Sequence, residues 1–325
     1  MPLPSWALEM NALAADRIPF LFIIDFEILS PIVIRLDALE GTGIQYTIPT
    51  AGEKSAGSHN HHASPIKLIK YPVAFDQYKD YFRRVMDALQ AGDTYLLNLC
   101  FSTRIEQAPS LQEIYQMASA PYKLFVPDRF VLFSPESFVQ IRENRIHTYP
   151  MKGTIDAAIP DAEIRLLQDL KEQEEHATVV DLLRNDLSMV SRQVTVDRYR
   201  YITTIETAEK KLLQCSSAIS GTLEDEFIQA PGSIMHALLP AGSVTGAPKK
   251  RTVEWIKAIE PESRGYYTGV FGVFDGQNLD SAVMIRMIEQ RPNGFYYRSG
   301  GGITYRSEAD KEYQELIDKV YVPIS

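Results

Sequence analysis

The sequence lacks several features that mark secreted and membrane-spanning proteins. Its 325 residues include only two cysteines, Cys100 and Cys215, which form neither a disulfide framework nor a CxxC metal motif. No basic segment of a signal peptide is present at the start, and the early apolar run Phe20–Ile24 is far too short to cross a bilayer. We therefore expect a cytoplasmic protein with no part in a membrane.

Nucleotide-binding and nucleic-acid-binding signatures are also missing. The formal net charge of -9 lacks the basic balance of nucleic-acid binders, so we expect no nucleic-acid partner. No glycine-rich segment ends in Gly-Lys-Ser/Thr or forms a dinucleotide GxGxxG in a βαβ unit. Apolar residues at 45% and charged residues at 23% are ordinary for a globular protein, and the length allows one large domain or two.

The pattern of apolar residues predicts a mixture of helices and strands. One helix follows Asp76 as N-cap and stops before Gly92, which suits a C′ position. The other predicted helices are 111–118, 161–190, a helix after the loop 241–249 with Pro248 at its first position, and a closing helix. The predicted strands are 94–103, 129–133, 138–141, 193–205, 267–274, 281–289, 295–299 and 303–305. This mixture indicates the α+β class, with antiparallel sheets rather than a regular βαβ series.

One stretch, 51–64, has the small and polar composition of a linker. His59, His61 and His62 lie in it, but a metal site needs ligands held in fixed geometry, which this stretch does not offer. We expect a mobile loop here, within a short N-terminal part formed by residues 1–70.

Two segments carry a candidate nucleophile and a candidate acid. Lys152 lies in PMKGT, between an apolar side chain and a glycine that lets a ligand approach the backbone. A dry pocket frees the lone pair of an amine for attack, although a solvent-exposed lysine at a strand end fits the same residues. Glu136, in SPE between two predicted strands, is a general-acid candidate if apolar surroundings keep it protonated, and otherwise a surface turn residue.

Acidic residues on two predicted helices form a candidate site for a divalent cation. Glu175 has apolar residues four and seven positions later and should face inward, where a carboxylate needs a partner or a cation. On the closing helix, Glu308, Glu312 and Glu315 align on one side. That pattern also fits a solvated face on which Glu315 pairs with Lys319. A second carboxylate would suit Mg²⁺, which uses few carboxylates together with water and substrate oxygens.

Glycines and one arginine indicate an anionic ligand. Consecutive unhindered amides at Gly300, Gly301 and Gly302 could cradle a carboxylate, and the loop 241–249 would face the positive end of the following helix. Arg286 lies in an apolar stretch, where a bidentate contact to a substrate carboxylate would justify its burial. Together the segments suggest a small polyanionic substrate, a divalent cation, an acid and an amine, without naming a reaction.

Seven ordered motifs resemble those of the chorismate-utilising enzymes. This family includes component I of anthranilate synthase, component I of aminodeoxychorismate synthase, and the isochorismate and salicylate synthases. The motifs are FSPESF, YPMKGT, EEHATVVDLLRNDL, LLPAGSVTGAPKKRTVEWI, RGYYTGVFG, SAVMIR and GGGITYRSEADKEYQE. The match runs over residues 75–325. The resemblance implies a single domain over residues 1–325, with two antiparallel sheets stacked face to face and helices outside.

The resemblance also implies a role for each matching residue. Lys152 would attack C2 of the chorismate ring, Glu136 would protonate the departing C4 hydroxyl, and ammonia would then displace the lysine by attack at C4. Glu175 and Glu315 would hold Mg²⁺ against the ring carboxylate, with Glu312 nearby. The implied substrate-binding residues are Arg286, Tyr267 and Gly300 for the enolpyruvyl carboxylate, Gly153, Thr154 and Gly302 for the ring carboxylate, and Gly301 beside them.

Within the family, Lys152 favours aminodeoxychorismate synthase, because anthranilate synthases generally carry alanine at this position. Isochorismate enzymes use a lysine base in the strand that corresponds to 94–99, and this sequence places Leu96 there, which counts against hydration. Leu96 and Gln214 also depart from the glutamine and histidine of many relatives, and the N-terminal part shows no counterpart of the tryptophan-binding motif. The resulting hypothesis is formation of 4-amino-4-deoxychorismate for 4-aminobenzoate and folate synthesis. An anthranilate or isochorismate synthase, or a non-catalytic binding paralogue, are the alternatives.

Neither cysteine lies in a context that resembles the nucleophile of a glutaminase, which needs a histidine and an acid beside it. We therefore expect ammonia to come from a separate glutamine amidotransferase subunit or from solution.

Overall fold

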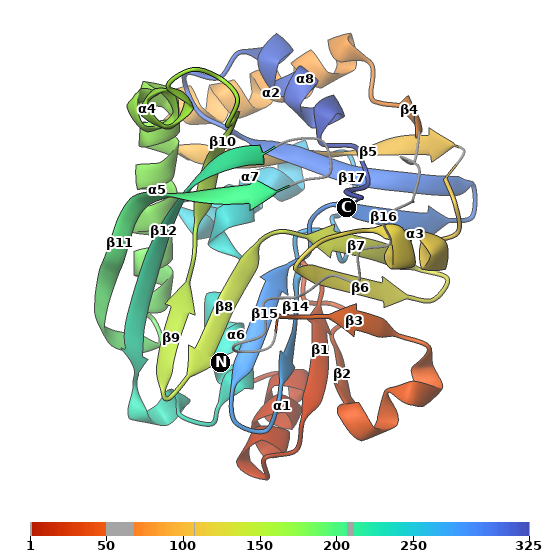
Figure 1. Cartoon of the computed structure of the whole chain (residues 1–325), viewed down its shortest axis with the longest axis vertical. Helices are drawn as coiled ribbons and strands as arrows, with labels where there is room; N and C mark the ends of the chain where they lie inside the picture. Colours follow the sequence, from red (N-terminus) through yellow and green to blue (C-terminus); the bar gives the residue numbers. More distant parts are fainter. Residues whose placement is uncertain (1, 50–67, 107, 207–210, 325) are drawn as a thin grey trace.

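The computed structural model describes residues 2–49, 68–106, 108–206 and 211–324, which build two antiparallel sheets with helices around them (Figure 1). The predicted linker 51–64, with its three histidines, lies outside the described residues. The first sheet runs in the order β10 (Met151–Asp156), β12 (Lys211–Leu223), β9 (Arg145–Thr148), β8 (Ser137–Arg142), β15 (Leu279–Val283), β14 (Val270–Phe274), β1 (Phe20–Ile24) and β2 (Ile32–Arg35), with β11 (Ser191–Glu206) paired to β12.

The second sheet runs in the order β13 (Gly246–Ala247), β5 (Leu96–Glu106), β17 (Gly294–Ile303), β16 (Met287–Arg291), β7 (Phe130–Ser134), β6 (Tyr122–Val126) and β3 (Gln45–Thr47), with β4 (Ile69–Tyr71) paired to β5. The helices are α1 (Ser5–Ala15), α2 (Phe75–Gln90), α3 (Leu111–Met117), α4 (Ala162–Gln168), α5 (Leu170–Leu187), α6 (Pro231–Leu238), α7 (Lys249–Ile259) and α8 (Ala309–Asp318). The α+β class with stacked antiparallel sheets is thereby confirmed. None of the described helices is long and apolar enough to cross a bilayer.

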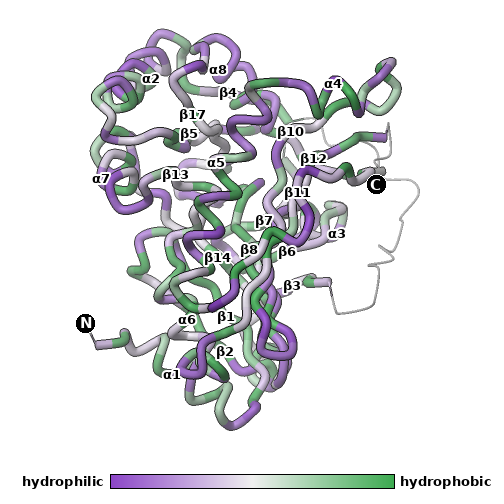
Figure 2. The backbone as a smooth tube through the Cα atoms, turned by 90° about the vertical axis from the view of Figure 1, so that its left-hand side faces the viewer, coloured by the Kyte–Doolittle hydropathy of each residue, from purple (hydrophilic) through white to green (hydrophobic). Residues whose placement is uncertain are grey.

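The apolar run of β1 is buried on both faces, which explains why it reads as continuous rather than alternating. Phe20, Phe22 and Ile24 pack into the core that α1, α5 and α6 cover, whereas Leu21 and Ile23 pack against the second sheet. The helices that cover the second sheet bury one stripe each. Figure 2 shows this amphipathic character as purple and green stretches that alternate along α2, α7 and α8.

Two predicted helix starts differ from the structure by a residue or more. Helix α2 begins at Phe75 after Ala74, so Asp76 lies in the first turn rather than at the N-cap. Pro248 precedes α7 instead of opening it. Gly92 adopts a φ of 75° just beyond the end of α2, as expected for a C′ glycine.

Other predicted elements are divided or joined differently. The predicted helix 161–190 consists of α4 and α5, because Asp169 between them caps the second helix by accepting a hydrogen bond from the Glu172 N–H at 3.0 Å. The strand predicted at 295–299 continues without a break to Ile303 as β17, whereas residues 304 and 305 of the predicted strand 303–305 lie beyond its end. The strand predicted at 267–274 starts only at Val270, which leaves Tyr267 in a turn.

The predicted strand 281–289 is interrupted, and the interruption carries the chain from one sheet to the other. Strand β15 belongs to the first sheet and β16 to the second, and Arg286 between them has a φ of 52°, outside the extended region of a regular strand. A second crossing lies beside it, where β7 of the second sheet leads through Glu136 into β8 of the first. The Val283 N–H donates to the Glu136 carbonyl at 3.1 Å, and the Phe133 N–H donates to the Arg286 carbonyl at 3.2 Å.

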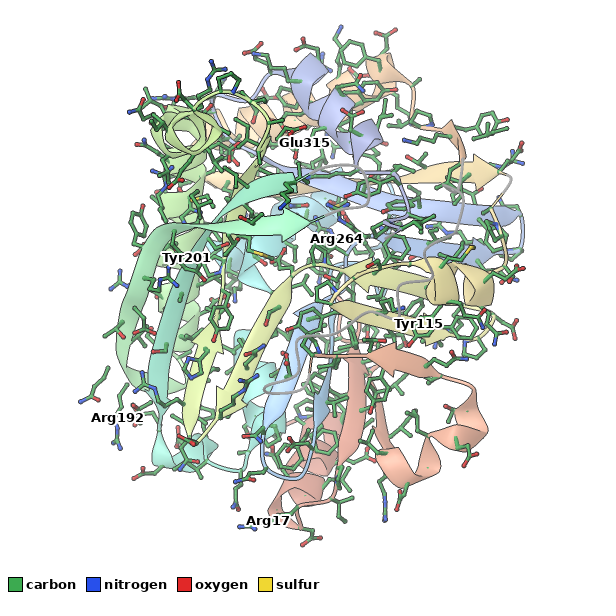
Figure 3. The ribbon with its side chains drawn as sticks, viewed as in Figure 1. Arg17, Tyr115, Arg192, Tyr201, Arg264 and Glu315 are labelled. Carbon is green, nitrogen blue, oxygen red and sulfur yellow. The ribbon has the colours of Figure 1, made fainter. Side chains whose placement is uncertain are left out.

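Arg264 lies near the centre of the molecule with its side chain 1% exposed (Figure 3). Nε and Nη2 contact both carboxylate oxygens of Glu260, at 2.9 and 2.6 Å. The remaining donors reach the carbonyls of Asn98 and Val244 and the Thr268 hydroxyl, at 2.6, 2.8 and 3.2 Å. This one side chain therefore joins β5, the loop before β13 and the turn that holds Tyr267.

We predict that Arg264→Met lowers the free energy of unfolding by about 3–5 kcal/mol, because it leaves the Glu260 carboxylate, 3% exposed, without its partner. Arg251→Met is the matched control, since it breaks an exposed pair with Asp93 and should cost less than about 1 kcal/mol. Urea unfolding of both variants measures the difference. If both variants lose the same free energy of unfolding, the buried network of Arg264 contributes no more to stability than an exposed ion pair does.

Candidate active site

The structure places almost all predicted site residues in the wall of one cavity of about 450 Å³. The cavity lies where the chain crosses between the two sheets, and it is closed by α5 on one side and α8 on another. The predicted residues that line it are Glu136, Lys152, Gly153, Thr154, Glu175, Tyr267, Arg286, Gly300, Gly302, Glu312 and Glu315. Gly301 is the member of the predicted set that does not line it.

Lys152 reaches the cavity from β10, opposite the glycines of β17. Its Nζ lies 3.8 Å from the point where a Cβ on Gly302 would be. The pairing of β10 with β12 shifts between Lys152 and Thr154, and Gly153 at this bulge has a φ of 72°. A Cβ on Gly153 would approach Leu166 to 2.8 Å and Glu172 to 2.9 Å. The positive φ favours glycine here whatever the space, and the bulge directs the neighbouring side chains.

Glu136 lies at the crossing from β7 to β8, where burial raises the pKa of its carboxyl. The Ser243 hydroxyl donates to Oε1 at 2.5 Å, and this hydrogen bond and the charges of Lys152 and Lys319 partly oppose the increase in pKa. The Glu136 N–H donates to the Ser134 hydroxyl at 3.1 Å, which holds the turn. A carboxyl with a raised pKa and a fixed hydroxyl partner can hold a proton and release it to a ligand.

Four glutamates from two helices face the same cavity: Glu172 and Glu175 of α5, and Glu312 and Glu315 of α8 (Figure 3 labels Glu315). Glu175 is 9% exposed and Glu312 4%. Glu312 accepts a hydrogen bond from the Ser307 hydroxyl at 2.7 Å. The arrangement fits a divalent cation that takes one carboxylate from each helix and its other ligands from water and substrate, as Mg²⁺ does. Within the described parts of the chain, no three acidic, histidine or cysteine side chains stand close enough to hold a metal by themselves.

The pair between Glu315 and Lys319 exists, at 2.7 Å, but it lies on the cavity wall rather than on a remote solvated face. The Lys319 ammonium also donates to the Gly300 carbonyl at 2.8 Å, which ties the end of α8 to β17. Glu308 points away and pairs with Lys311 at 2.6 Å.

Arg286 and Tyr267 form another part of the wall. The Arg286 guanidinium carbon lies 4.6 Å from the ring centre of Tyr321, and its Nη1 is buried with no hydrogen-bond acceptor among the described residues. Tyr267 is 4% exposed, and burial raises the pKa of its hydroxyl well above the ordinary value. A partly buried arginine with a spare N–H and a neutral tyrosine, both in the wall of one cavity, can bind a carboxylate.

The glycine run lies in a strand, beyond the part of β17 that pairs with β16, which ends at Arg298. Gly300, Gly301 and Gly302 lie inside β17 and pair with residues of β5, so they belong to a sheet rather than to a loop. A Cβ on Gly300 would lie 2.6 Å from the Cys100 sulfur, which explains the glycine there. Gly301 turns to the other face of the strand, because successive strand residues point to opposite sides.

Several cavity residues were not predicted from the sequence. Ser243, Asn98, Glu172, Arg298 and Lys319 all line the wall. Glu172 precedes Glu175 by three residues and so shares its helix face, and Arg298 alternates with Gly300 and Gly302 along a strand. Both spacings are visible in the sequence. Ser243 gave no such signal beyond its position in a glycine-rich loop.

The two departures from the family pattern also have defined places. Gln214 lines the cavity and pairs with Thr154 across β10 and β12. Leu96 is 3% exposed, and its Cδ1 lies 3.0 Å from the point where a Cβ on Gly302 would be. Both cysteines are buried, and burial raises the pKa of both thiols, that of Cys100 to about 12, which disfavours a thiolate at either position.

An acid, a lysine and two arginines around a cavity between stacked sheets define an enzyme-like binding site for a small ligand with several anionic groups. The family model described as chorismate binding enzyme matches residues 36–325, and the chain belongs to this family.

Two proteins of different length are similar to this chain in sequence. The chain is 48% identical to the Haemophilus influenzae protein named "Uncharacterized PabA-like protein" over 97% of this chain and 95% of that protein. It is 32% identical to aminodeoxychorismate synthase component 1 of Klebsiella aerogenes over 75% of this chain and 56% of that protein. The chain therefore spans little more than half the length of this enzyme that it matches.

Solved structures share the fold. Anthranilate synthase component I of Streptococcus pneumoniae superimposes with a TM-score of 0.68 at 28% identity, over 80% of this chain and 60% of that chain. The menaquinone-specific isochorismate synthase of Escherichia coli gives 0.69 at 17% identity, over 97% of this chain and 79% of that chain, and this second similarity concerns the fold alone.

We predict that Glu136→Gln stabilises the protein, and more so at alkaline than at acidic pH. The folded-state pKa of Glu136 lies above its unfolded value, so its ionisation lowers stability as the pH rises through the folded pKa, whereas below the unfolded pKa no such loss exists. Glutamine stays neutral throughout. Free energies of unfolding at about pH 4 and about pH 8 test the difference. Glu308→Gln on the exposed side of α8 is the control, and the same pH dependence in both variants would contradict the assignment.

Proposed function

We propose that the chain is component I of an aminodeoxychorismate synthase, which replaces the C4 hydroxyl of chorismate with an amino group for 4-aminobenzoate and folate synthesis. The observation that carries the proposal is the placement of the Lys152 amine and the Glu136 carboxyl, with its raised pKa, in one cavity. The Klebsiella aerogenes relative named aminodeoxychorismate synthase component 1 supports it.

The chemistry divides one difficult displacement into two. The Lys152 amine attacks C2, the two conjugated ring double bonds shift, and the C4–O bond breaks while Glu136 gives its proton to the hydroxyl, which leaves as water. Ammonia then attacks C4, both double bonds shift back, and the C2–N bond to Lys152 breaks. Glu136 takes up the proton that ammonia releases, which returns both side chains to their initial states. The sum is chorismate plus ammonia giving the amine plus water.

Substrate binding would use both ends of the cavity. Arg286, Tyr267 and Gly300 would receive the enolpyruvyl carboxylate, and Gly153, Thr154 and Gly302 the ring carboxylate. Glu175 and Glu315, with Glu312 nearby, are the residues that would hold Mg²⁺, whose role when bound is to neutralise the ring carboxylate.

The charge in the cavity supports a bound cation. Five glutamates and four basic side chains line the wall. When Glu136 is protonated and the Lys152 amine is neutral, as its attack requires, four carboxylates face three cations. A dicarboxylate adds two further negative charges to this partly buried site, which a divalent cation would oppose.

Leu96 favours amination over hydration of the ring. It places a methyl group near Gly302, on the side of the cavity that Lys152 also reaches, and it offers no hydrogen bond that would activate a water molecule. Ammonia would reach the site from a separate glutamine amidotransferase subunit, because neither cysteine of this chain suits glutamine hydrolysis.

The product of the purified chain tests the proposal. With chorismate, Mg²⁺ and an ammonium salt at alkaline pH, mass spectrometry should detect the product in which an amino group replaces the hydroxyl, because raising the pH supplies neutral ammonia. Glutamine as the sole nitrogen source should give no product, and excess chelator should stop the reaction. A product with the mass of chorismate would indicate isochorismate, anthranilate would indicate the other amination, and undiminished turnover in chelator would contradict the metal site.

The covalent intermediate is a separate prediction. Wild-type protein with chorismate and Mg²⁺ but no ammonia should carry an adduct on the peptide that contains Lys152. Lys152→Ala should reduce turnover strongly, with partial recovery at high ammonia through direct attack on the ring. Glu136→Gln should lose about 10²–10⁴-fold and should not recover, because both routes need the proton. Full activity of Lys152→Ala, together with no adduct on the Lys152 peptide of the wild-type protein, would contradict this mechanism.

A further inference from the structure

Two arginines in the cavity wall each keep a buried N–H group without an acceptor. These groups are Nη1 of Arg286 and Nε of Arg298, and neither has a hydrogen-bond partner among the described residues. Arg298 is 2% exposed, so bulk water does not cover its side chain. A buried donor without an acceptor destabilises a protein, and the natural remedy is a ligand that supplies the acceptor.

The rest of the Arg298 guanidinium is firmly held. Its Nη1 lies 2.9 Å from Glu262 Oε1 and donates to the Ser102 hydroxyl at 3.1 Å, while Nη2 donates to the Ser263 carbonyl at 3.2 Å. Glu262 is fixed in turn by Arg291 at 3.0 Å. The protein therefore occupies one edge of the guanidinium and leaves the Nε–H of the other edge unused, in a side chain that cannot turn to find another partner.

Strand geometry brings this free donor to the Arg286 end of the cavity. Arg298 shares a face of β17 with Gly300 and Gly302, and in the sheet it lies opposite Met287, the residue after Arg286. Its guanidinium carbon lies 5.4 Å from the ring centre of Tyr267. Arg286 and Arg298 both line the cavity, and a carboxylate has one oxygen for each of their two N–H groups that lack an acceptor.

We propose that Arg298 is a substrate-binding residue, whose Nε–H and the Nη1–H of Arg286 bind the two oxygens of one substrate carboxylate. The inference deepens the proposed function, on which it rests for the identity of that group as the enolpyruvyl carboxylate of chorismate. Glu262 pairs with the other edge of the guanidinium and has no part in this contact.

Dissociation constants measured by calorimetry test the role of Arg298 with two ligands, chorismate and its side-chain carboxamide, both in the presence of Mg²⁺. Arg298→Gln should weaken the binding of chorismate about tenfold or more, since it removes a charge-assisted hydrogen bond, while the binding of the amide changes little. Arg298→Lys should keep the ion pair with Glu262 and most of the thermal stability, yet lose the same selectivity, because a lysine whose ammonium pairs with Glu262 has no N–H at the position of the arginine Nε.

Glu262→Gln is the matched control, because it leaves the Nε–H in place and removes only a partner of the other edge. It should weaken the binding of chorismate much less than Arg298→Gln does. Equal weakening for chorismate and the amide, or a Glu262→Gln variant that copies Arg298→Gln, would assign Arg298 a structural role and overturn the proposal. Where Arg298→Gln does not fold, the lysine variant carries the same comparison. The identity of the reaction product tests the proposed function separately, so either conclusion can fail without the other.

Discussion

Two neighbouring crossings between the sheets govern the geometry of this molecule. At one the chain leaves the second sheet through Glu136, and at the other it enters that sheet through Arg286. Hydrogen bonds join each crossing to the other, from Val283 to Glu136 and from Phe133 to Arg286. A chain that changes sheet cannot keep its regular strand pairing at that point, so the two sheets separate there. The cavity opens at this position, and Glu136 and Arg286 both line it.

The surroundings of the crossings are rigid, and their rigidity is electrostatic as well as apolar. Arg264 joins three segments of the wall through hydrogen bonds, and a hydrogen bond of Lys319 joins the end of α8 to β17. Neither residue needs to touch a substrate to matter, because each fixes the direction of groups that line the cavity. A site built in this way is organised before the ligand arrives, which is what chemistry on a small polyanion requires.

Much of this site could be predicted from the sequence, because its signals are local. Lys152 between an apolar residue and a glycine, and Glu175 on an apolar helix face, can be recognised within a few positions, and both line the cavity. The features of the site that could not be predicted depend on the whole fold. The break at Arg286 lies in an unbroken apolar stretch and occurs because the chain must change sheets, and the glycines at 300–302 resembled a loop although they lie in a strand that packs closely on Cys100. Ser243 gains its importance only from the approach of its loop to Glu136.

The cavity draws its wall from segments that are spread between β5 and α8, far apart along the chain. Such a site cannot exist in a fragment, and it is complete only when both sheets have formed and the last helix has docked. Contacts between residues so far apart in the sequence form late and slowly during folding, because long loops must close before these contacts can stabilise the chain. A ligand that fills the cavity therefore recognises only the finished molecule, so its binding free energy adds to the cooperativity of the entire fold rather than to one local element.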